Sequence, residues 1–303
     1  MLDRGKQRCA TTMMDLLISL GLWGGIRQLR DAIVLWLDDW TLRQKGLKCH
    51  VCLSKHIWRD GHEKRKNRCP VQRYTCVECG RDFCINTLAP WYWHKYSSAS
   101  IILFLWYIFC GDSILNTRNL CSFAKKIPSW KTLWNWLQKF GTIIIYKSSR
   151  IKQKVSRHRA WQNDEMYLRD KPIIGTVDPQ TNTIFLTPSW RADNKSLFSH
   201  MRRALTKWKK KPRGWWTDEW QAYPKAFDIL EIPHSTIKHR DWEFKNSKGI
   251  TTNAIENIWR QFRRWLFRKN GLKHQAYVDF YVDLFEARYN IIKNPLIMIE
   301  MLF

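Results

Sequence analysis

The sequence predicts an α/β domain with a mixed sheet and flanking helices in the second half of the chain, preceded by a small zinc ribbon and a helical segment. Three observations support this fold class. Apolar residues recur at helical spacing before residue 45 and again between residues 97 and 140. The intervening stretch loses that period and contains two Cys-x-x-Cys pairs. Beyond residue 160, short β-prone runs alternate with helical patterns, as in an α/β sheet.

The charge balance indicates a nucleic-acid partner. The 303 residues include 52 Lys and Arg against 26 Asp and Glu, which gives a formal net charge of +26. So much like charge repels itself within a compact fold and is best tolerated beside a polyanion. Nucleic acid is therefore the favoured partner, and an anionic membrane surface is the second candidate. The strongest apolar run, 101–110, has half the length that a membrane-spanning helix needs, so we expect no span.

Two helical segments flank the cysteine-rich stretch. Residues 89–146 form the second, in which Ser129 is a suitable cap for a helix that continues past Lys139. This segment could form a helix-turn-helix whose DNA-reading helix runs from Lys131 to Lys139; a purely structural pair of helices is the alternative. Residues 1–45 form the first, with apolar side chains on one face at Leu29, Ile33, Leu37 and Trp40.

Four cysteines give the strongest metal signal. Each Cys-x-x-Cys pair can place two thiolates on one tight turn, and two such turns complete a tetrahedron around Zn²⁺. We therefore predict one structural zinc ion in a ribbon over residues 46–88 that helps to hold DNA; a ribbon that only holds a small domain together is the alternative. The predicted ligands are Cys49, Cys52, Cys76 and Cys79. Side chains that could compete with them are Cys69, Cys84, His50, His56 and His62.

A basic linker over residues 147–160 leads into the predicted α/β domain at 161–303. Its β-prone runs fall at 165–168, 173–177, 183–187, 214–217 and 235–238. Its helical patterns fall at 196–208, 253–268 and 276–290.

Three acidic residues stand out in this domain because carboxylates are scarce. Asp164 opens a β-prone run, Asp218 follows an apolar strand end, and Glu256 lies one turn into a helix. Two strand carboxylates and one helical carboxylate could converge at the open end of a sheet and hold two Mg²⁺ or Mn²⁺ ions. Each also has a purely structural interpretation. Asp164 or Glu165 could pair with an arginine, Asp218 could cap a helix, and Glu256 could form a capping box with Asn253.

The sequence around these acids resembles Merlin-type DDE transposases and their bacterial insertion-sequence relatives. Residues 216–223, Trp-Thr-Asp-Glu-Trp-Gln-Ala-Tyr, resemble the second acidic block of that family. Residues 252–259, Thr-Asn-Ala-Ile-Glu-Asn-Ile-Trp, resemble the third block, and residues 164–167, Asp-Glu-Met-Tyr, resemble the first. His234 and His239 lie where the family carries histidines. The first block lacks the stretch that often follows it, which leaves the choice between Asp164 and Glu165 open.

The resemblance covers roughly residues 160–290 and implies an RNase H-like sheet, two magnesium ions, cleavage at element ends and strand transfer within a homodimer or higher multimer. It implies action on double-stranded DNA, hence in the nucleus of a eukaryotic host and otherwise in the cytoplasm or nucleoid. A non-catalytic regulator derived from such an enzyme, or another RNase H-like structure-selective nuclease, are the alternatives. Basic residues that we expect to contact DNA are Arg263, Arg264, Lys131, Lys139, Lys209, Lys210 and Lys211.

Overall fold

The computed structural model describes residues 46–63, 71–84, 113–120, 127–156, 159–237, 251–268 and 275–291, with single positions at 87, 96, 101 and 104. The chain divides into two compact units. One comprises residues 1–108, 114–140 and 294–303, and the other comprises residues 109–113 and 141–293. The helix predicted over residues 1–45 lies outside the described residues, as do Cys69 and His239.

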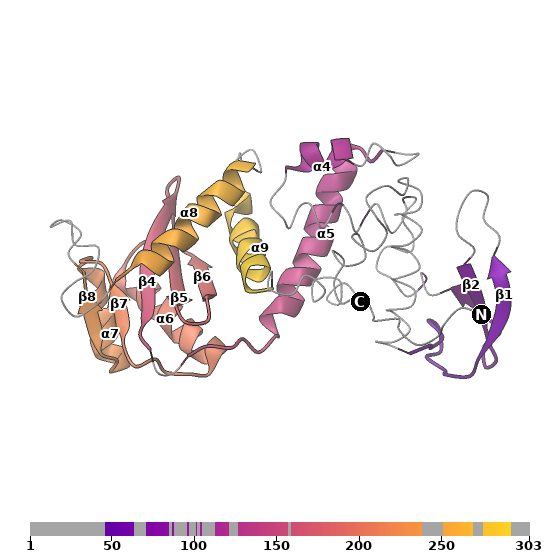
Figure 1. Ribbon diagram of the computed structural model, residues 1–303, viewed down its shortest axis with the longest axis horizontal. Coiled ribbons are helices and arrows are strands. Elements are labelled where there is room, and N and C mark those ends of the chain that lie inside the picture. The colour runs from indigo at the N-terminus through magenta and orange to yellow at the C-terminus, as the bar shows by residue number, and fades with distance from the viewer. Residues whose placement is uncertain are drawn as a thin grey trace, which may run out of the picture. The chain divides into compact units, whose positions relative to one another are not determined.

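The first unit contains a small antiparallel sheet with the strand order β1-β2-β3 (Figure 1). Its strands are β1 (Ile57–Glu63), β2 (Val71–Cys76) and β3 (Asp82–Cys84). Two of the predicted zinc ligands, Cys49 and Cys76, are fully buried and pack with Tyr74 and Phe83 in a core of only a few side chains. This small core explains why the module would need a metal ion, since so little apolar surface is buried here.

Helices α4 (Ile114–Leu120) and α5 (Trp130–Ser149) follow the ribbon. The predicted cap is confirmed, because the Ser129 hydroxyl accepts a hydrogen bond from the Thr132 amide at 3.2 Å. Helix α5 is longer than its predicted apolar pattern and continues through the first residues of the expected basic linker. None of the described helices is long and apolar enough to cross a membrane.

The second unit is built on a five-stranded mixed sheet with the order β6-β5-β4-β7-β8 (Figure 1). Strands β4, β5 and β6 are antiparallel neighbours, whereas β7 runs parallel to β4 and β8 runs parallel to β7. The strands are β4 (Trp161–Leu168), β5 (Lys171–Asp178), β6 (Thr183–Pro188), β7 (Trp215–Thr217) and β8 (His234–Thr236). Three antiparallel strands continued by two parallel ones form the predicted RNase H-like sheet, so this fold prediction is confirmed.

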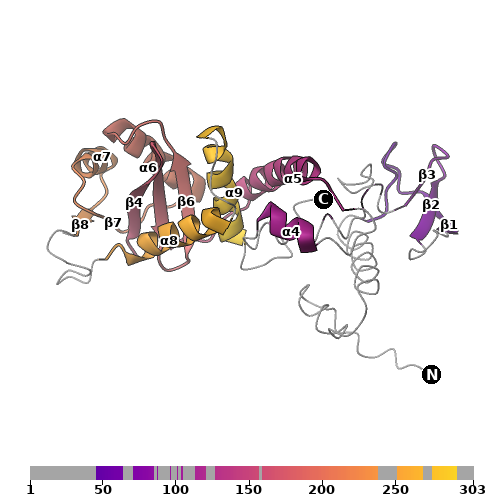
Figure 2. The ribbon, with the colours of Figure 1, turned by 90° about the horizontal axis from the view of Figure 1, so that it is seen from above.

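Helices cover both faces of this sheet (Figure 2). Helices α6 (Asn194–Trp208) and α7 (Ala222–Leu230) pack on one face, and α8 (Asn253–Arg268) lies on the other. Helix α9 (Val278–Ile291) packs against the edge strand β6. A short 3-10 turn, Gln275–Tyr277, precedes α9. On the α6 face the ring of Trp161 meets Trp208 and Trp215 edge to face, with centroids 4.6 Å and 5.4 Å apart. Because both faces are covered, β5 is buried at every position.

Side chains of α9 occupy the outer edge of strand β6. The Asn290 side chain accepts from the Ile184 amide and donates to the Ile184 carbonyl, both at 2.9 Å. Glu286 accepts from the Leu186 amide at 2.6 Å and pairs with Lys207 of α6 at 2.5 Å. Helix α9 therefore hydrogen-bonds the backbone groups that an edge strand would otherwise expose.

Candidate active site

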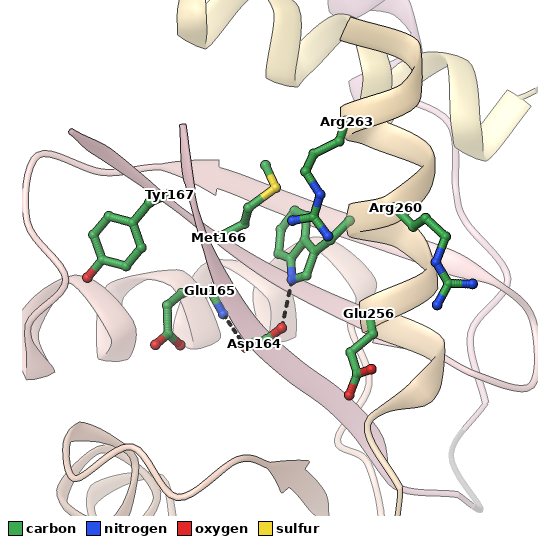
Figure 3. Close-up of a pocket in the computed structure, with 8 residues that line it drawn as sticks. Asp164, Glu165, Met166, Tyr167, Glu256, Arg260 and Arg263 are labelled. Carbon is green, nitrogen blue, oxygen red and sulfur yellow. Dashed lines mark hydrogen bonds between the residues drawn. The ribbon is translucent and has the colours of Figure 1, made fainter. Parts of the chain in front are cut away.

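Strand β4 carries Asp164, whose carboxylate is held from two sides (Figure 3). Its Oδ1 accepts from the Glu165 amide and its Oδ2 accepts from the Trp259 indole of α8, each at 2.9 Å. Gly175 is the ladder partner of Asp164 on β5. A Cβ atom at Gly175 would lie 2.6 Å from the Trp259 ring, so the absence of a side chain there lets the indole reach Asp164.

Two further carboxylates lie beside Asp164. Glu165 is the next residue of β4, and its Oε2 accepts from the Tyr223 hydroxyl of α7 at 2.9 Å. Asp218 directly follows β7, and its Oδ1 accepts from the Trp220 amide at 3.2 Å. Oxygen atoms of Asp164, Glu165 and Asp218 all lie within 4.8 Å of one another, and all three residues are half-buried. Parallel pairing of β4 with β7 places these carboxylates together.

Burial and mutual repulsion raise the pKa values of this cluster. Burial, followed by the charges of Glu165 and Asp218, raises the pKa of Asp164 to about 7. Burial and the charge of Asp218 likewise raise the pKa of Glu165 to about 7. A divalent cation among the three groups would offset this repulsion. Because all the donors are hard oxygen atoms, the cluster fits Mg²⁺ or Mn²⁺ better than Zn²⁺.

Glu256 lies on α8, whose first turn is fastened to β4. The buried side chain of Gln162 accepts hydrogen bonds from the Ala254 and Ile255 amides at 2.9 Å and 3.1 Å. Glu256 itself accepts from the Thr252 hydroxyl at 2.8 Å. Gln162 therefore satisfies two amides of the first helical turn.

A pocket of about 360 Å³ joins the acids to the basic face of α8 (Figure 3). Glu256 lines this pocket with Asp164 and Glu165, although among the described residues the 4.8 Å cluster contains Asp218 and not Glu256. Figure 3 shows Arg260 and Arg263 projecting from α8 beyond Glu256. The full lining is Asp164, Glu165, Met166, Tyr167, Glu256, Trp259, Arg260 and Arg263.

The other basic residues predicted to contact DNA have different surroundings. Arg264 is exposed on α8, next to the pocket residue Arg263. Lys210 is half-buried and donates to the Val155 carbonyl, which ties it to the segment before β4. The remaining four are exposed; Lys131 and Lys139 lie on α5, and Lys209 and Lys211 follow α6.

The sulfur atoms of Cys49, Cys52, Cys76 and Cys79 all lie within 4.8 Å of one another in the first unit. Cys49 and Cys79 approach to 3.5 Å, as do Cys52 and Cys76. Each pair sits on a tight turn closed by backbone hydrogen bonds, and Gly80 supplies the positive φ of 65° in the second turn. This geometry fits a tetrahedral zinc site.

Four of the side chains named as competing ligands lie among the described residues, and none of them belongs to the cysteine cluster. His56 pairs with Glu78 at 2.8 Å, and the His50 ring lies edge-on to Phe83. Cys84 is buried beside Thr87, while His62 is exposed on β1. Among the residues that the structure describes, the cysteine cluster consists of the four predicted residues.

Several residues around the acids were not singled out from the sequence. Arg260 follows Glu256 by one helical turn on α8. This i,i+4 spacing could have identified Arg260 from the sequence as a neighbour of Glu256. Gln162, Tyr223 and Trp259 act through contacts 58 to 95 residues away in sequence, which no local pattern encodes. His234 lies where the family resemblance places a histidine. Its Nε2 forms a hydrogen bond with the Thr217 hydroxyl at 2.7 Å, and burial lowers the pKa of His234 to about 4.

Comparison with known proteins gives a family match over part of the chain. Residues 158–295 match the model of a family described as a DDE domain. A comparison with curated proteins gives no match. Among solved structures, the chain is similar to the HTLV-2 integrase catalytic core domain in complex with magnesium, with 16% identity and a TM-score of 0.33 over 45% of this chain and 87% of that chain. It is also similar to the BIV integrase catalytic core domain, with 12% identity and a TM-score of 0.33 over 43% of this chain and 81% of that chain.

The family match and the sheet described above fall on the same part of the chain. All five strands of the mixed sheet lie within the matched residues. So do Asp164, Asp218 and Glu256. The part of the chain that is similar to a DDE domain therefore contains the mixed sheet and all three acids.

Proposed function

We propose that this chain is a DNA transposase that cleaves phosphodiester bonds at the ends of a mobile element and joins the freed ends to target DNA. The observation that carries the proposal is the position of Asp164, which clusters with Glu165 and Asp218 and also lines a pocket with Glu256 and two arginines that could bind phosphate. These residues lie within the stretch that matches a DDE domain. The net charge of the whole chain, +26, suits a polyanionic substrate.

In this proposal Asp164, Asp218 and Glu256 are the metal ligands. When bound, two Mg²⁺ or Mn²⁺ ions would activate the attacking oxygen and stabilise the leaving oxygen of the scissile phosphodiester. Trp259 and the Glu165 amide orient Asp164, and the Gln162 cap fixes the helix that presents Glu256. Arg263 lines the pocket and would contact a DNA phosphate there, and we add Arg260, which also lines the pocket, to the proposed contacts.

The reaction would take place in two displacements. Water attacks the phosphodiester at an element end, and the bond to the 3′ oxygen breaks to leave a free 3′-hydroxyl. That hydroxyl then attacks a phosphodiester of the target, forming the new joint and releasing one target 3′-hydroxyl. Neither displacement needs a covalent intermediate with the protein.

The rest of the chain would hold the DNA. We assign residues 46–88 to a zinc ribbon with one structural Zn²⁺ on Cys49, Cys52, Cys76 and Cys79. From the segment 89–146, helix α5 would offer Lys131 and Lys139. Lys209 to Lys211 and Arg264 would extend the basic surface of the catalytic domain. The active species would be a homodimer or higher multimer on double-stranded DNA, in whichever compartment holds that DNA.

An assay with labelled DNA that carries the sequences flanking the gene tests this function. The purified full chain with Mg²⁺ should nick the element end and then produce a longer labelled product in the presence of target DNA. Binding of this DNA without nicking would favour the alternative of a non-catalytic, transposase-derived regulator. Nicking of branched or structured DNA without joining would favour a structure-selective nuclease.

A further inference from the structure

A chain of hydrogen bonds runs through the core of the catalytic domain and ends at Glu165. The Tyr223 hydroxyl, 2.9 Å from Glu165 Oε2, accepts from Asn163 Nδ2 at 3.3 Å. Asn163 Oδ1 accepts from the Thr176 hydroxyl, which lies 2.8 Å from His200 Nε2. The other ring nitrogen of His200 lies 2.9 Å from the Thr187 hydroxyl. We call Thr187, His200, Thr176, Asn163 and Tyr223 the core relay.

The direction of every hydrogen bond in the core relay follows from its two ends. An ionised Glu165 only accepts, so Tyr223 donates to it and accepts from the Asn163 amide. Asn163 then presents its carbonyl oxygen to the Thr176 hydroxyl, which leaves Thr176 to accept from His200. His200 is neutral because burial lowers its pKa to about 3, so its second nitrogen accepts from Thr187. All five donors therefore point toward the Glu165 carboxylate.

Because the core relay is buried, any of its polar groups left without a hydrogen-bond partner would destabilise the fold. Asn163, Thr176, His200 and Tyr223 are all 0% exposed, and Tyr223 also belongs to the apolar cluster between the sheet and helices α6 and α7. Buried polar groups that lack a partner cost on the order of 1–3 kcal/mol each. Bonds aligned in one direction polarise one another, which strengthens the last bond to the carboxylate. The side chain that gains from this alignment is Glu165, at the edge of the acidic cluster.

We propose that the core relay positions Glu165 as a fourth metal-facing carboxylate, which binds a divalent cation together with Asp164 and Asp218. The inference rests on the proposed function, because it concerns the same cation site. Tyr223 engages Oε2 of Glu165, and an oxygen of this carboxylate lies within 4.8 Å of oxygens of both aspartates. Asp164 has its own support from Trp259 on α8, so the two neighbouring carboxylates are held from opposite faces of the sheet. Tyr223 is therefore a positioning residue that acts through Glu165.

The test is the affinity of the zinc-loaded full chain for Mn²⁺ alone, measured by titration calorimetry. Tyr223→Phe should weaken Mn²⁺ binding about 10-fold, the size expected when an outer partner of a metal ligand is lost. Thr176→Val breaks the relay further from Glu165 and should have a smaller effect in the same direction. Tyr281→Phe is the matched control, because Tyr281 is a buried tyrosine of the same unit that packs on Trp265. Its Mn²⁺ affinity should equal that of the parent.

A double-mutant cycle separates positioning from general stability. Glu165→Gln should weaken Mn²⁺ binding by itself, and adding Tyr223→Phe to it should cause no further loss. Additive losses would overturn the inference, as would an unchanged affinity in Tyr223→Phe while Asp164→Asn still binds Mn²⁺ poorly. That second result would leave the proposed function intact. If Asp164→Asn and Asp218→Asn also bind Mn²⁺ like the parent, the proposed catalytic site fails together with the relay.

Discussion

The ribbon and the catalytic pocket both gather metal-ligating side chains, but they position them in different ways. Cys49, Cys52, Cys76 and Cys79 sit on two tight turns closed by local backbone hydrogen bonds, over a core of a few side chains. The carboxylates of the candidate active site come from β4, from the residue after β7 and from α8, and a large core and buried hydrogen bonds hold these elements in place. The ribbon should therefore depend on its metal for folding, whereas the catalytic domain should fold without metal and need it only for chemistry.

Removal of zinc should give the largest effect. Structural zinc contributes about 10–16 kcal/mol in small zinc-binding modules. Chelation, or Cys76→Ser, should therefore unfold residues 46–88 and leave the sheet of the catalytic domain protected. Hydrogen exchange followed by mass spectrometry measures both regions in one sample. Equal loss of protection in 161–188 would show that the two regions fold as one unit.

Removal of a proposed catalytic carboxylate should have the opposite effect: cleavage is lost, while the fold stays stable. Asp164→Asn, Asp218→Asn and Glu256→Gln keep the side-chain shape but remove a charged ligand, so cleavage with Mg²⁺ should fall about 1,000-fold or more. The melting temperature should stay nearly constant, and the Asp164 and Asp218 variants should gain slightly because their carboxylates repel each other. Parent-like cleavage by Glu256→Gln would remove Glu256 from the site. If Glu165→Gln abolishes cleavage and Asp164→Asn does not, the first ligand is Glu165.

A smaller substitution tests whether packing positions the catalytic acid. Gly175→Ala would push the Trp259 ring away from Asp164, so cleavage should fall about 10-fold, and overpacking should cost about 1–3 kcal/mol of unfolding free energy. Gly141→Ala is the control, since its Cβ would meet Phe280 at 2.8 Å, outside the pocket lining. Gly141→Ala should cost stability but keep cleavage. Equal loss of cleavage in both variants would mean that stability alone sets the activity.

The smallest expected effect is a pH dependence of the catalytic domain. Buried His200 has its pKa lowered to about 3, mainly by burial, whereas in the unfolded chain it titrates near 6.5. Between these values the unfolded state binds a proton that the folded state does not, so stability falls as the pH falls. From pH 7 to pH 5 the loss should be about 2 kcal/mol. Comparison with His200→Gln by denaturant unfolding isolates this contribution, and parallel pH profiles for the two proteins would contradict it.

The sequence predicted the ribbon and the order of elements because both depend on local patterns. The paired cysteines lie on the turns that their spacing suggested, and helix α8 begins and ends at its predicted residues, 253 and 268. Strand β4 was predicted only from residue 165 because its first half is not an alternating run; Gln162 and Asn163 are polar yet buried. They are buried because Gln162 caps α8 and Asn163 joins the core relay.

The candidate site was predictable only in part for a similar reason. Asp164, Asp218 and Glu256 could be chosen by their local context and by resemblance. Glu165 was left as an alternative to Asp164. The sequence cannot show that carboxylate oxygens of both Asp164 and Glu165 approach Asp218. The partners Trp259 and Gly175 could not be inferred at all, since a helix and a strand 84 residues apart create their contact. Long-range packing thus determines how the acids are held, while local pattern determines where they occur.

The side chains of α9 on strand β6 have a consequence for assembly. A bare outer strand would act as a template on which a second chain could add its own strand, and sheets extended in this way grow without limit. Asn290 and Glu286 already use the hydrogen-bonding groups of Ile184 and Leu186 on that side. The β6 edge is therefore closed to strand addition, and copies of this protein would not extend the sheet from that side.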